Sequence, residues 1–389
     1  MQDKAKILHL IESLNMGGAQ KIIYQLASTS DSSDHSVCSL YQGGPYEKIM
    51  RDDDIDLTLL KAKRRSVIFF PLFIYDLYCI FTRLVRIVKK DQIDILHAHL
   101  PDSSLIAIVV GKLTNTTVVL TVHNNFALPS KRKAPLRDAL RTLVTNMVFK
   151  RANYIITVGN DIRDSLYDAL GYRVAIKTVY NGVDYLRYAR DLKKLDHLQF
   201  RQSLGISDKA TIVTTVGRLD KQKGHTYLID AAQQLIDDYP ALIFLLVGEG
   251  ELKEKLMDQV QSLQLSNNFI FLGNRNDVPD ILAMSDLFVL PSIYEGIPLV
   301  ILEAMAAGLP VVATDIAGTR ELVESGVDGL LAKTESPKDI ARTMNELLSD
   351  MACSKEMSLL AQAKVKKEFS LQKMVTGTEH IYLEVLGSV

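Results

Sequence analysis

Two glutamates, eight residues apart, are the first residues in this 389-residue sequence whose types and spacing suggest chemistry. Residues 294–303 read YEGIPLVILE, so a glycine, a proline and five aliphatic side chains separate Glu295 from Glu303. A carboxylate in an apolar helix is costly to bury unless a partner satisfies it. Because an ionised carboxylate only accepts hydrogen bonds, its partner must be a donor such as a pair of hydroxyl groups or an arginine.

The sequence around the two glutamates predicts a strand, a loop and a helix. Residues 286–291 (DLFVLP) form a short apolar run typical of a buried strand. Residues 299–307 predict a helix with Pro298 at its first position, where the missing N–H costs nothing. Glu295 then lies in the loop at the carboxyl end of the strand, where open α/β sheets bind their ligands. Gly296 lets another molecule approach the backbone closely.

The first turn of that helix predicts an anion-binding site. The N–H groups near Leu299 and Val300 lack helical partners there, and the helix dipole favours negative charge. A phosphate-binding site with a carboxylate at either end would suit a ligand in which a diphosphate lies between two groups that carry several hydroxyls. A nucleotide-sugar is such a ligand. The alternative is that Glu303 is only a buried residue paired with an arginine.

Other polar residues also follow predicted strands. Arg218 and Lys223 come directly after the run 211–217 and have the charge needed to neutralise a departing diphosphate. Their alternative role is ordinary solvated surface charge. Asn274 and Arg275 follow another strand and are candidates for the wall of a base pocket.

The first half of the chain offers softer candidates. Gly17 and Gly18 follow the first predicted strand and either bring backbone amides to a phosphate or sugar or form a tight turn. They are not part of a GxGxxG fingerprint for dinucleotides. His123 ends another predicted strand, and His97 and His99 end a third. A strand-end histidine is either structural or functional, and the sequence does not decide between the two.

A metal site is not expected. The run 52–56 (DDDID) has carboxylates spaced for a divalent ion, but its polar surroundings favour a solvated turn. The cysteines form no CxxC pair, which argues against structural zinc and fits a reducing cytoplasm. They are Cys38, Cys79 and Cys353.

Strands and helices alternate along the chain, as in parallel sheets with crossover helices. An Asn-Gly turn at 179–184 and a polar segment up to about residue 208 interrupt the alternation. We therefore predict two doubly wound domains joined near 180–205, with a cleft between them, and a helical segment at 337–389. The predicted strands are 7–11, 93–97, 117–122 and 154–158, then 211–217, 242–247, 269–272, 287–290 and 311–313.

Composition sets outer limits on function. A hydrophobic content of 47% in 389 residues is enough for two domain cores. A net charge of −1 gives no overall case for a nucleic-acid partner. The balance is uneven, however, with +6 over residues 1–185 and −7 over the rest, so we expect the first half to face something anionic.

Taken together, these motifs resemble the retaining GT-B glycosyltransferases with the Glu-x7-Glu signature, known as family 4 or group 1. The resemblance covers nearly the whole chain. It rests on MGGA, DILHAH, TVHN, YNGVD, VGRLDKQKG, LLVGEG, YEGIPLVILEAMAAGLPVVAT and AGTREL followed by GLL. One departure is Gln20, where relatives commonly carry a glutamate, so the roles of side chains in that loop are open.

The resemblance implies an α/β fold of the GT-B class, in which two doubly wound Rossmann-like domains face a cleft. Residues 1–182 would form the acceptor-side domain, and a C-terminal helix of about 373–389 would cross back to it. Residues 183–372 would form the domain that binds the nucleotide-sugar donor.

The resemblance also implies roles for the candidate residues. Glu295 would bind hydroxyls of the donor sugar and Glu303 the ribose hydroxyls. Arg218 and Lys223 would stabilise the leaving diphosphate, which makes a metal cofactor unnecessary. His123 would face the sugar near its reacting carbon. The backbone that would hold sugar and phosphate comprises Gly17 and Gly18 together with Gly296, Ile297, Pro298, Leu299 and Val300, while Asn274 and Arg275 stay candidates for the base.

The activity implied is that of a retaining hexosyl- or N-acetylhexosaminyl-transferase. It would move a sugar from a nucleotide-sugar, by default a UDP-sugar, to a saccharide or lipid-linked saccharide in bacterial surface polysaccharide assembly. No enzyme nucleophile stands out that would support a covalent intermediate. One alternative is a nucleotide-sugar epimerase, which would need acid and base residues around the sugar ring. Another is a non-catalytic nucleotide-sugar-binding protein.

Two basic and apolar segments, 61–90 and 131–151, predict contact with a membrane surface. Both lie in the positively charged half, and a helix with apolar and basic faces can lie on an anionic membrane. The alternative is a pair of ordinary crossover helices. We expect a cytoplasmic protein, free or peripheral on the inner face of the cell membrane.

Overall fold

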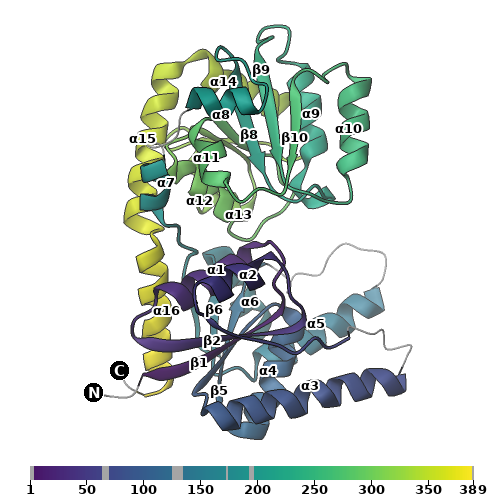
Figure 1. Cartoon of the computed structure of the whole chain (residues 1–389), viewed down its shortest axis with the longest axis vertical. Coiled ribbons are helices and arrows are strands. Elements are labelled where there is room, and N and C mark those ends of the chain that lie inside the picture. Colours follow the sequence, from purple (N-terminus) through teal and green to yellow (C-terminus); the bar gives the residue numbers. More distant parts are fainter. Residues whose placement is uncertain (1–3, 64–69, 125–134, 172–173, 192–196, 388–389) are drawn as a thin grey trace. The chain divides into compact units, whose positions relative to one another are not determined.

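The computed structural model describes residues 4–63, 70–124, 135–171, 174–191 and 197–387. The chain divides into two compact units (Figure 1). Unit 1 contains residues 1–181 and 372–389, and unit 2 contains residues 182–371. Each unit is an α/β domain in which helices connect the strands of a parallel sheet, as the sequence predicts.

Unit 1 is built on a seven-stranded parallel sheet of order β3-β2-β1-β4-β5-β6-β7. The strand order reverses between β1 and β4, as in doubly wound folds. Every residue of β4 is buried, as expected when helices cover both faces of a parallel sheet. The strands are β1 (Ala5–Ser13), β2 (Ser33–Gln42), β3 (Asp56–Leu59), β4 (Ile95–His99), β5 (Thr117–Val122), β6 (Tyr154–Thr157) and β7 (Ile176–Thr178).

Seven helices in the described part of the chain accompany this sheet. The last of them comes from the C-terminus of the sequence. Its residues Ile381 and Tyr382 are buried in one cluster with Ile7, Ile95 and other strand residues of unit 1. The helices are α1 (Gly18–Thr29), α2 (Pro45–Asp52), α3 (Phe70–Asp91), α4 (Pro101–Thr114), α5 (Pro135–Phe149), α6 (Asn160–Leu170) and α16 (Leu371–Val385).

Unit 2 is built on a six-stranded parallel sheet of order β10-β9-β8-β11-β12-β13. Its strand order reverses between β8 and β11, so the carboxyl ends of these two neighbours form the switch point where ligands bind in such sheets. The strands are β8 (Thr211–Val216), β9 (Leu242–Val247), β10 (Phe269–Gly273), β11 (Leu287–Leu290), β12 (Val311–Thr314) and β13 (Leu330–Ala332).

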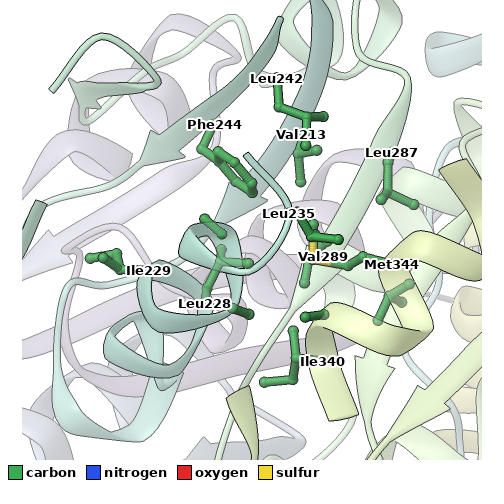
Figure 2. Packing of buried hydrophobic residues seen from close by; sticks show 14 of the residues in the cluster. Val213, Leu228, Ile229, Leu235, Leu242, Phe244, Leu287, Val289, Ile340 and Met344 are labelled. Carbon is green, nitrogen blue, oxygen red and sulfur yellow. The ribbon is translucent and has the colours of Figure 1, made fainter. Parts of the chain in front are cut away.

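A large cluster of buried hydrophobic residues packs strands of this sheet against helices of unit 2. Figure 2 shows Phe244 and Val289 of the strands packed with Leu228 of α9 and Met344 of α14. The helical segments are α7 (Tyr185–Asp191), α8 (His197–Ser203), the 3-10 turn η2 (Lys221–Lys223), α9 (His225–Gln233), α10 (Lys253–Ser262), α11 (Val278–Ala283), α12 (Leu299–Ala306), α13 (Ala317–Arg320), α14 (Pro337–Ser349) and α15 (Met351–Glu368).

The structure corrects some predicted elements. Strands β2, β3, β7 and β13 were not predicted, because β2 is half polar (SDHSVCSLYQ) and the others have only three or four residues. Pro298 is the residue before helix α12 and not its first residue, with ψ of 107° in the extended region. Among the described residues, no helix combines the length and the apolar character that a membrane crossing would need.

Candidate active site

A buried ion pair joins two of the predicted site residues in unit 2. The Nζ of Lys223 donates to Oε1 of Glu295 at 2.6 Å, and the two side chains are 14% and 8% exposed. Two residues that the sequence analysis missed complete the site: Ser292 Oγ donates to the same oxygen at 2.7 Å, and Gln222 Nε2 donates to Oε2 at 3.3 Å. Glu295, in the loop that follows β11, therefore accepts hydrogen bonds from three side chains.

The loops after β8 and β11 are tightly packed against each other. Gly224 follows Lys223 with φ of +64°, and a Cβ atom there would lie 2.1 Å from the carbonyl oxygen of Pro291. The side chain of Asp220 caps the turn by accepting from the backbone N–H of Lys223 at 3.2 Å. Because β8 and β11 are neighbours, their carboxyl ends bring Lys223 and Glu295 together.

Arg218 lies on the same loop but reaches into solvent. Its side chain is 67% exposed and pairs with Asp220 at 2.9 Å. Its Nη2 also donates to Gln222 Oε1 at 3.3 Å, which links it to Glu295 through the side chain of Gln222. Burial lowers the pKa of the neighbouring His225 to about 4, so this imidazole adds no charge near neutral pH.

Helix α12 carries Glu303 into the interior of unit 2. Glu303 is buried, and among the residues of α12 only Val300 is partly exposed. Gly296, Ile297 and Pro298, which precede the helix, are also buried. The structure thus places Glu295 and Glu303 on one loop and helix, with the first turn of α12 between them, as predicted from the sequence.

A neighbouring segment covers the backbone of the glutamate loop. A Cβ atom on Gly318 in α13 would lie 1.5 Å from the carbonyl oxygen of Gly296. Thr314 Oγ1 donates to the carbonyl oxygen of Ser292 at 2.5 Å. Thr319 Oγ1 in turn donates to the carbonyl oxygen of Thr314. The loop is therefore shaped by the end of β12 and by α13, and only a glycine fits at position 318.

The two base-pocket candidates line a cavity in unit 2. Asn274 and Arg275 border a hollow of about 490 Å³ together with Arg187 and Asp277. Arg275 is held by two hydrogen bonds to the carboxylate of Asp277, at 2.8 and 2.5 Å. That pairing fixes the guanidinium, while Asn274 and Asn276 add amide groups to the lining of the hollow.

In unit 1, the side chain of Gln20 bridges the loop that contains Gly17 and Gly18. Gly17 is the residue before α1, and Gly18 is the first residue of that helix. Gln20 is buried, and its Nε2 donates to the carbonyl oxygen of Ser13 at 3.0 Å. A glutamate could not make this bond because a carboxylate has no hydrogen to donate. The departure at position 20 therefore has a structural use within the loop.

The strand-end histidines of unit 1 lie close together. His99 Nδ1 is 3.1 Å from His123 Nε2, and His97 is bonded to Tyr382 Oη and Thr121 Oγ1, both at 2.6 Å. Burial lowers the pKa of His123 to about 4 and that of His97 to about 3. The aspartates of 52–56 are exposed and lie between the end of α2 and the start of β3, away from these strand ends.

The two doubly wound units, with an acidic loop and two cations at the switch point of unit 2, define the architecture of a GT-B glycosyltransferase. The family model "Glycosyltransferase Family 4" matches residues 16–187, and "Glycosyl transferases group 1" matches residues 196–364. The chain belongs to this glycosyltransferase family. It is therefore an enzyme that transfers a sugar from a nucleotide-sugar donor.

Relatives resemble the chain over almost its full length. An Escherichia coli protein named UDP-Gal:alpha-D-GlcNAc-diphosphoundecaprenol alpha-1,3-galactosyltransferase is 28% identical, with 98% of each chain covered. The N-acetyl-alpha-D-glucosaminyl L-malate synthase of Bacillus anthracis is 25% identical, with 96% of this chain and 95% of the relative covered. Among solved structures, Anabaena HepE in complex with UDP and glucose has a TM-score of 0.81 at 25% identity, covering 99% of this chain and 100% of HepE.

The contact at Gly318 gives a direct test of the glutamate loop. Gly318→Ala would place a methyl group on the carbonyl of Gly296, so we expect the loop to shift and turnover of the nucleotide-sugar to fall by roughly 100-fold, as for other small displacements of reacting groups. The measurement is kcat in a donor hydrolysis or transfer assay. Gly205→Ala is the control. Its Cβ would meet no atom within 4 Å, so this variant adds the same methyl group, at a φ of +71°, without a contact. Equal turnover in both variants would contradict the role of this contact.

Proposed function

We propose that this enzyme is a retaining glycosyltransferase that moves a sugar from a UDP-sugar to a lipid-linked saccharide in bacterial surface polysaccharide assembly. The observation that carries the donor side of this proposal is the Lys223–Glu295 pair at the switch point of unit 2. The names of the similar E. coli galactosyltransferase and of the HepE complex support a UDP-sugar donor and a lipid-linked acceptor. Unit 2 is then the donor domain and unit 1 the acceptor domain.

The proposed donor site divides a nucleotide-sugar among three kinds of group. Glu295 accepts hydrogen bonds from hydroxyls of the sugar, while Glu303 accepts from the ribose diol. The first-turn N–H groups near Leu299 and Val300 hold the phosphates between them. Asn274, in the wall of the cavity beside α11, contacts the base. A ribose diol has two hydroxyl groups that can donate hydrogen bonds to the carboxylate of Glu303.

Lys223 and Arg218 provide the positive charge for the leaving diphosphate. Lys223 neutralises Glu295 before the donor binds and lies close enough to attract the phosphate that departs from the sugar beside it. Arg218 is exposed and can turn toward the same phosphate. Interactions that strengthen as charge develops lower the barrier and not only the binding energy. We propose that these two cations make a metal ion unnecessary.

Retention of anomeric configuration follows from same-face attack in this proposal. Glu295 is the carboxylate nearest the proposed sugar position, but three donors already hold it, so it is poorly placed to act as a nucleophile. The leaving phosphate then helps to deprotonate the acceptor hydroxyl on the same face. His123 of unit 1 faces the sugar near its reacting carbon.

An apolar surface on three helices of unit 1 supports docking on a membrane. Helix α4 packs against both α3 and α5, and each of the three exposes large apolar side chains. Exposed apolar clusters of this kind mark interaction sites. They are Leu72, Ile74, Tyr75 and Tyr78 on α3, Leu105, Val109 and Leu113 on α4, and Leu143, Val144 and Met147 on α5. The row on α4 was not predicted.

Basic residues accompany this surface. Lys61 and Lys63 are exposed ahead of α3, while the remaining basic residues of 64–69 and 131–134 lie outside the described residues. Each basic residue near an anionic membrane contributes about 1 kcal/mol. We propose that unit 1 binds peripherally to the inner face of the cell membrane, where a lipid-linked acceptor would be presented, and that the protein is cytoplasmic.

The two glutamates should have separable roles in donor binding. Glu303→Gln should weaken UDP binding by roughly 1.5–3 kcal/mol, the worth of a charged hydrogen bond, because its proposed partner is the ribose. Glu295→Gln should reduce turnover while UDP affinity stays close to that of the native enzyme. Calorimetry with UDP and a transfer assay measure the two effects, with the exposed Glu346→Gln as control. Equal losses of UDP affinity in both variants would contradict the assignment.

The membrane surface can be tested with vesicles. The native protein should float with vesicles containing anionic lipid at low salt and detach as salt rises, because screening weakens the attraction. Tyr75→Ser with Tyr78→Ser should abolish flotation. Leu359→Ser with Leu360→Ser removes another exposed apolar pair, from α15 of unit 2, and should leave flotation unchanged.

Charge variants separate the electrostatic part of this binding. Lys61→Ser with Lys63→Ser should reduce the fraction of protein that floats with anionic vesicles at low salt. The remaining binding should also depend less on salt. If the native protein ignores anionic vesicles at low salt, a soluble acceptor becomes the better hypothesis and the donor-site assignments stand unaffected.

A further inference from the structure

A chain of side-chain hydrogen bonds runs through unit 1 from His123 to the C-terminal helix. His123 Nε2 is 3.1 Å from His99 Nδ1, and His99 Nε2 is 3.3 Å from His9 Nδ1. His9 Nε2 is 2.8 Å from His35 Nδ1, and His35 Nε2 is 3.1 Å from Oε1 of Glu379 in α16. Each inner ring therefore uses both of its nitrogens within the chain.

The sheet register produces this arrangement. The histidines come from the four adjacent strand positions β2, β1, β4 and β5. His9 is paired with His97, and His99 lies two residues further on; His99 is paired with Thr121, and His123 lies two residues beyond that. Because side chains alternate between the faces of a strand, steps of two keep every ring on the same face. The result is a diagonal row across the sheet.

Glu379 fixes one end of the row as a charged acceptor. Burial raises the pKa of Glu379, but hydrogen bonds from His35, Ser30 and Ser33 outweigh it and lower the pKa to about 2. Ser33 Oγ donates to Oε2 at 2.6 Å, and Ser30 Oγ donates to Oε1. An ionised carboxylate has no hydrogen to donate, so the Nε2 of His35 must carry one.

The hydrogen positions then follow from ring to ring. In a chain of neutral imidazoles, each ring has one donor nitrogen and one acceptor nitrogen. If His35 donates through Nε2, its Nδ1 accepts from His9 Nε2, and His9 Nδ1 accepts from His99 Nε2. His99 Nδ1 accepts from His123 Nε2 in the same way. The last ring, His123, is left with Nδ1 as an acceptor.

Burial favours the neutral form of three rings of the row, His9, His99 and His123. Burial lowers the pKa of His9 and of His99 well below the ordinary value, and lowers that of His123 to about 4. Among the described residues, Glu379 is a charged group that is hydrogen-bonded to the row, and it lies at the opposite end from His123.

We propose that Glu379 and the histidines between it and His123 are positioning residues that hold His123 in the tautomer with Nδ1 as hydrogen-bond acceptor. This inference rests on the proposed function, in which His123 faces the donor sugar. A hydroxyl of that sugar donates a hydrogen bond to Nδ1. In the opposite tautomer Nδ1 carries a hydrogen of its own and could not accept this bond. The carboxylate of Glu379 on α16 thereby determines which nitrogen of His123 is the hydrogen-bond acceptor.

A metal ion does not account for the cluster equally well. His9, His97 and His99 have one nitrogen each within 4.8 Å of the others. Every ring nitrogen of these three residues, however, already lies 2.6–3.3 Å from a hydrogen-bonding atom, including Tyr382 Oη and Thr121 Oγ1 on His97. A nitrogen that ligates a metal has no lone pair or hydrogen left for such a bond.

The test reads the tautomer directly in the full-length protein without ligands. The ¹⁵N chemical shifts of histidine-labelled protein distinguish a protonated from a bare ring nitrogen, and His123→Asn identifies the signals of His123. In the native protein we expect a single tautomer with bare Nδ1. In Glu379→Gln the side-chain amide can donate as well as accept, so the Nδ1 signal of His123 should move toward the protonated position.

Turnover gives the second readout. Glu379→Gln should lower kcat by about tenfold, the worth of one neutral hydrogen bond, with little change in UDP affinity. The control is Glu384→Gln on the same helix, an exposed residue outside the row that should change neither readout. If Glu379→Gln does not fold, His35→Gln interrupts the row at the next position and should produce the same two changes.

The outcomes separate this inference from the proposed function. An unchanged His123 tautomer in folded Glu379→Gln, with turnover still lost in His123→Asn, overturns the positioning role alone. A changed tautomer with full turnover in His123→Asn overturns the proposed role of His123, and the positioning role with it. Stoichiometric zinc binding by the native protein that abolishes the single-tautomer spectrum would also overturn the inference.

Discussion

The ion pair between Lys223 and Glu295 is the interaction on which the proposed donor site depends. Two charges removed from water carry a large desolvation cost, which their attraction offsets only when geometry is good and other polar groups help. Ser292 and Gln222 provide that help at Glu295. The pair thus ties the loop after β8 to the loop after β11 at the switch point of the sheet. Losing either charge would leave the other buried without its partner.

The rest of unit 2 preserves the geometry of this pair. Gly224 and Gly318 allow two backbone contacts that a side chain would prevent, and Thr314 holds the carbonyl of Ser292. Behind them lies a tightly packed apolar core, in which Phe244 and Met344 are buried. A site built on strand ends above such a core is held more accurately than one on free loops. The buried Glu303 breaks the apolar pattern of α12, as residues kept for function commonly do.

The sequence predicted the strand, loop and helix that carry Glu295 and Glu303, for a physical reason. Parallel strands bring their carboxyl ends to one edge, so residues that follow these strands, such as Lys223 and Glu295, were expected to line a ligand site there. Their direct ion pair was not predicted. Ser292 and Gln222 were missed, because a serine or glutamine in a polar loop carries no distinguishing pattern. The row of histidines was also not predicted, because it requires the register of β2, a half-polar strand without a continuous apolar pattern. Glu379 comes from a helix whose docking on unit 1 no local pattern specifies.

The most direct test of the donor-site account is the turnover of Lys223→Ala compared with Lys253→Ala. Lys253 also pairs with a glutamate at 2.7 Å, but at a more exposed position on α10, so it controls for the loss of one lysine and one ion pair. If Lys223 stabilises the departing diphosphate, its variant should lose roughly 100- to 1,000-fold in kcat, and the native enzyme should keep its activity in a metal chelator. Turnover near the native level in Lys223→Ala, or activity that a chelator abolishes and magnesium restores, would contradict the account.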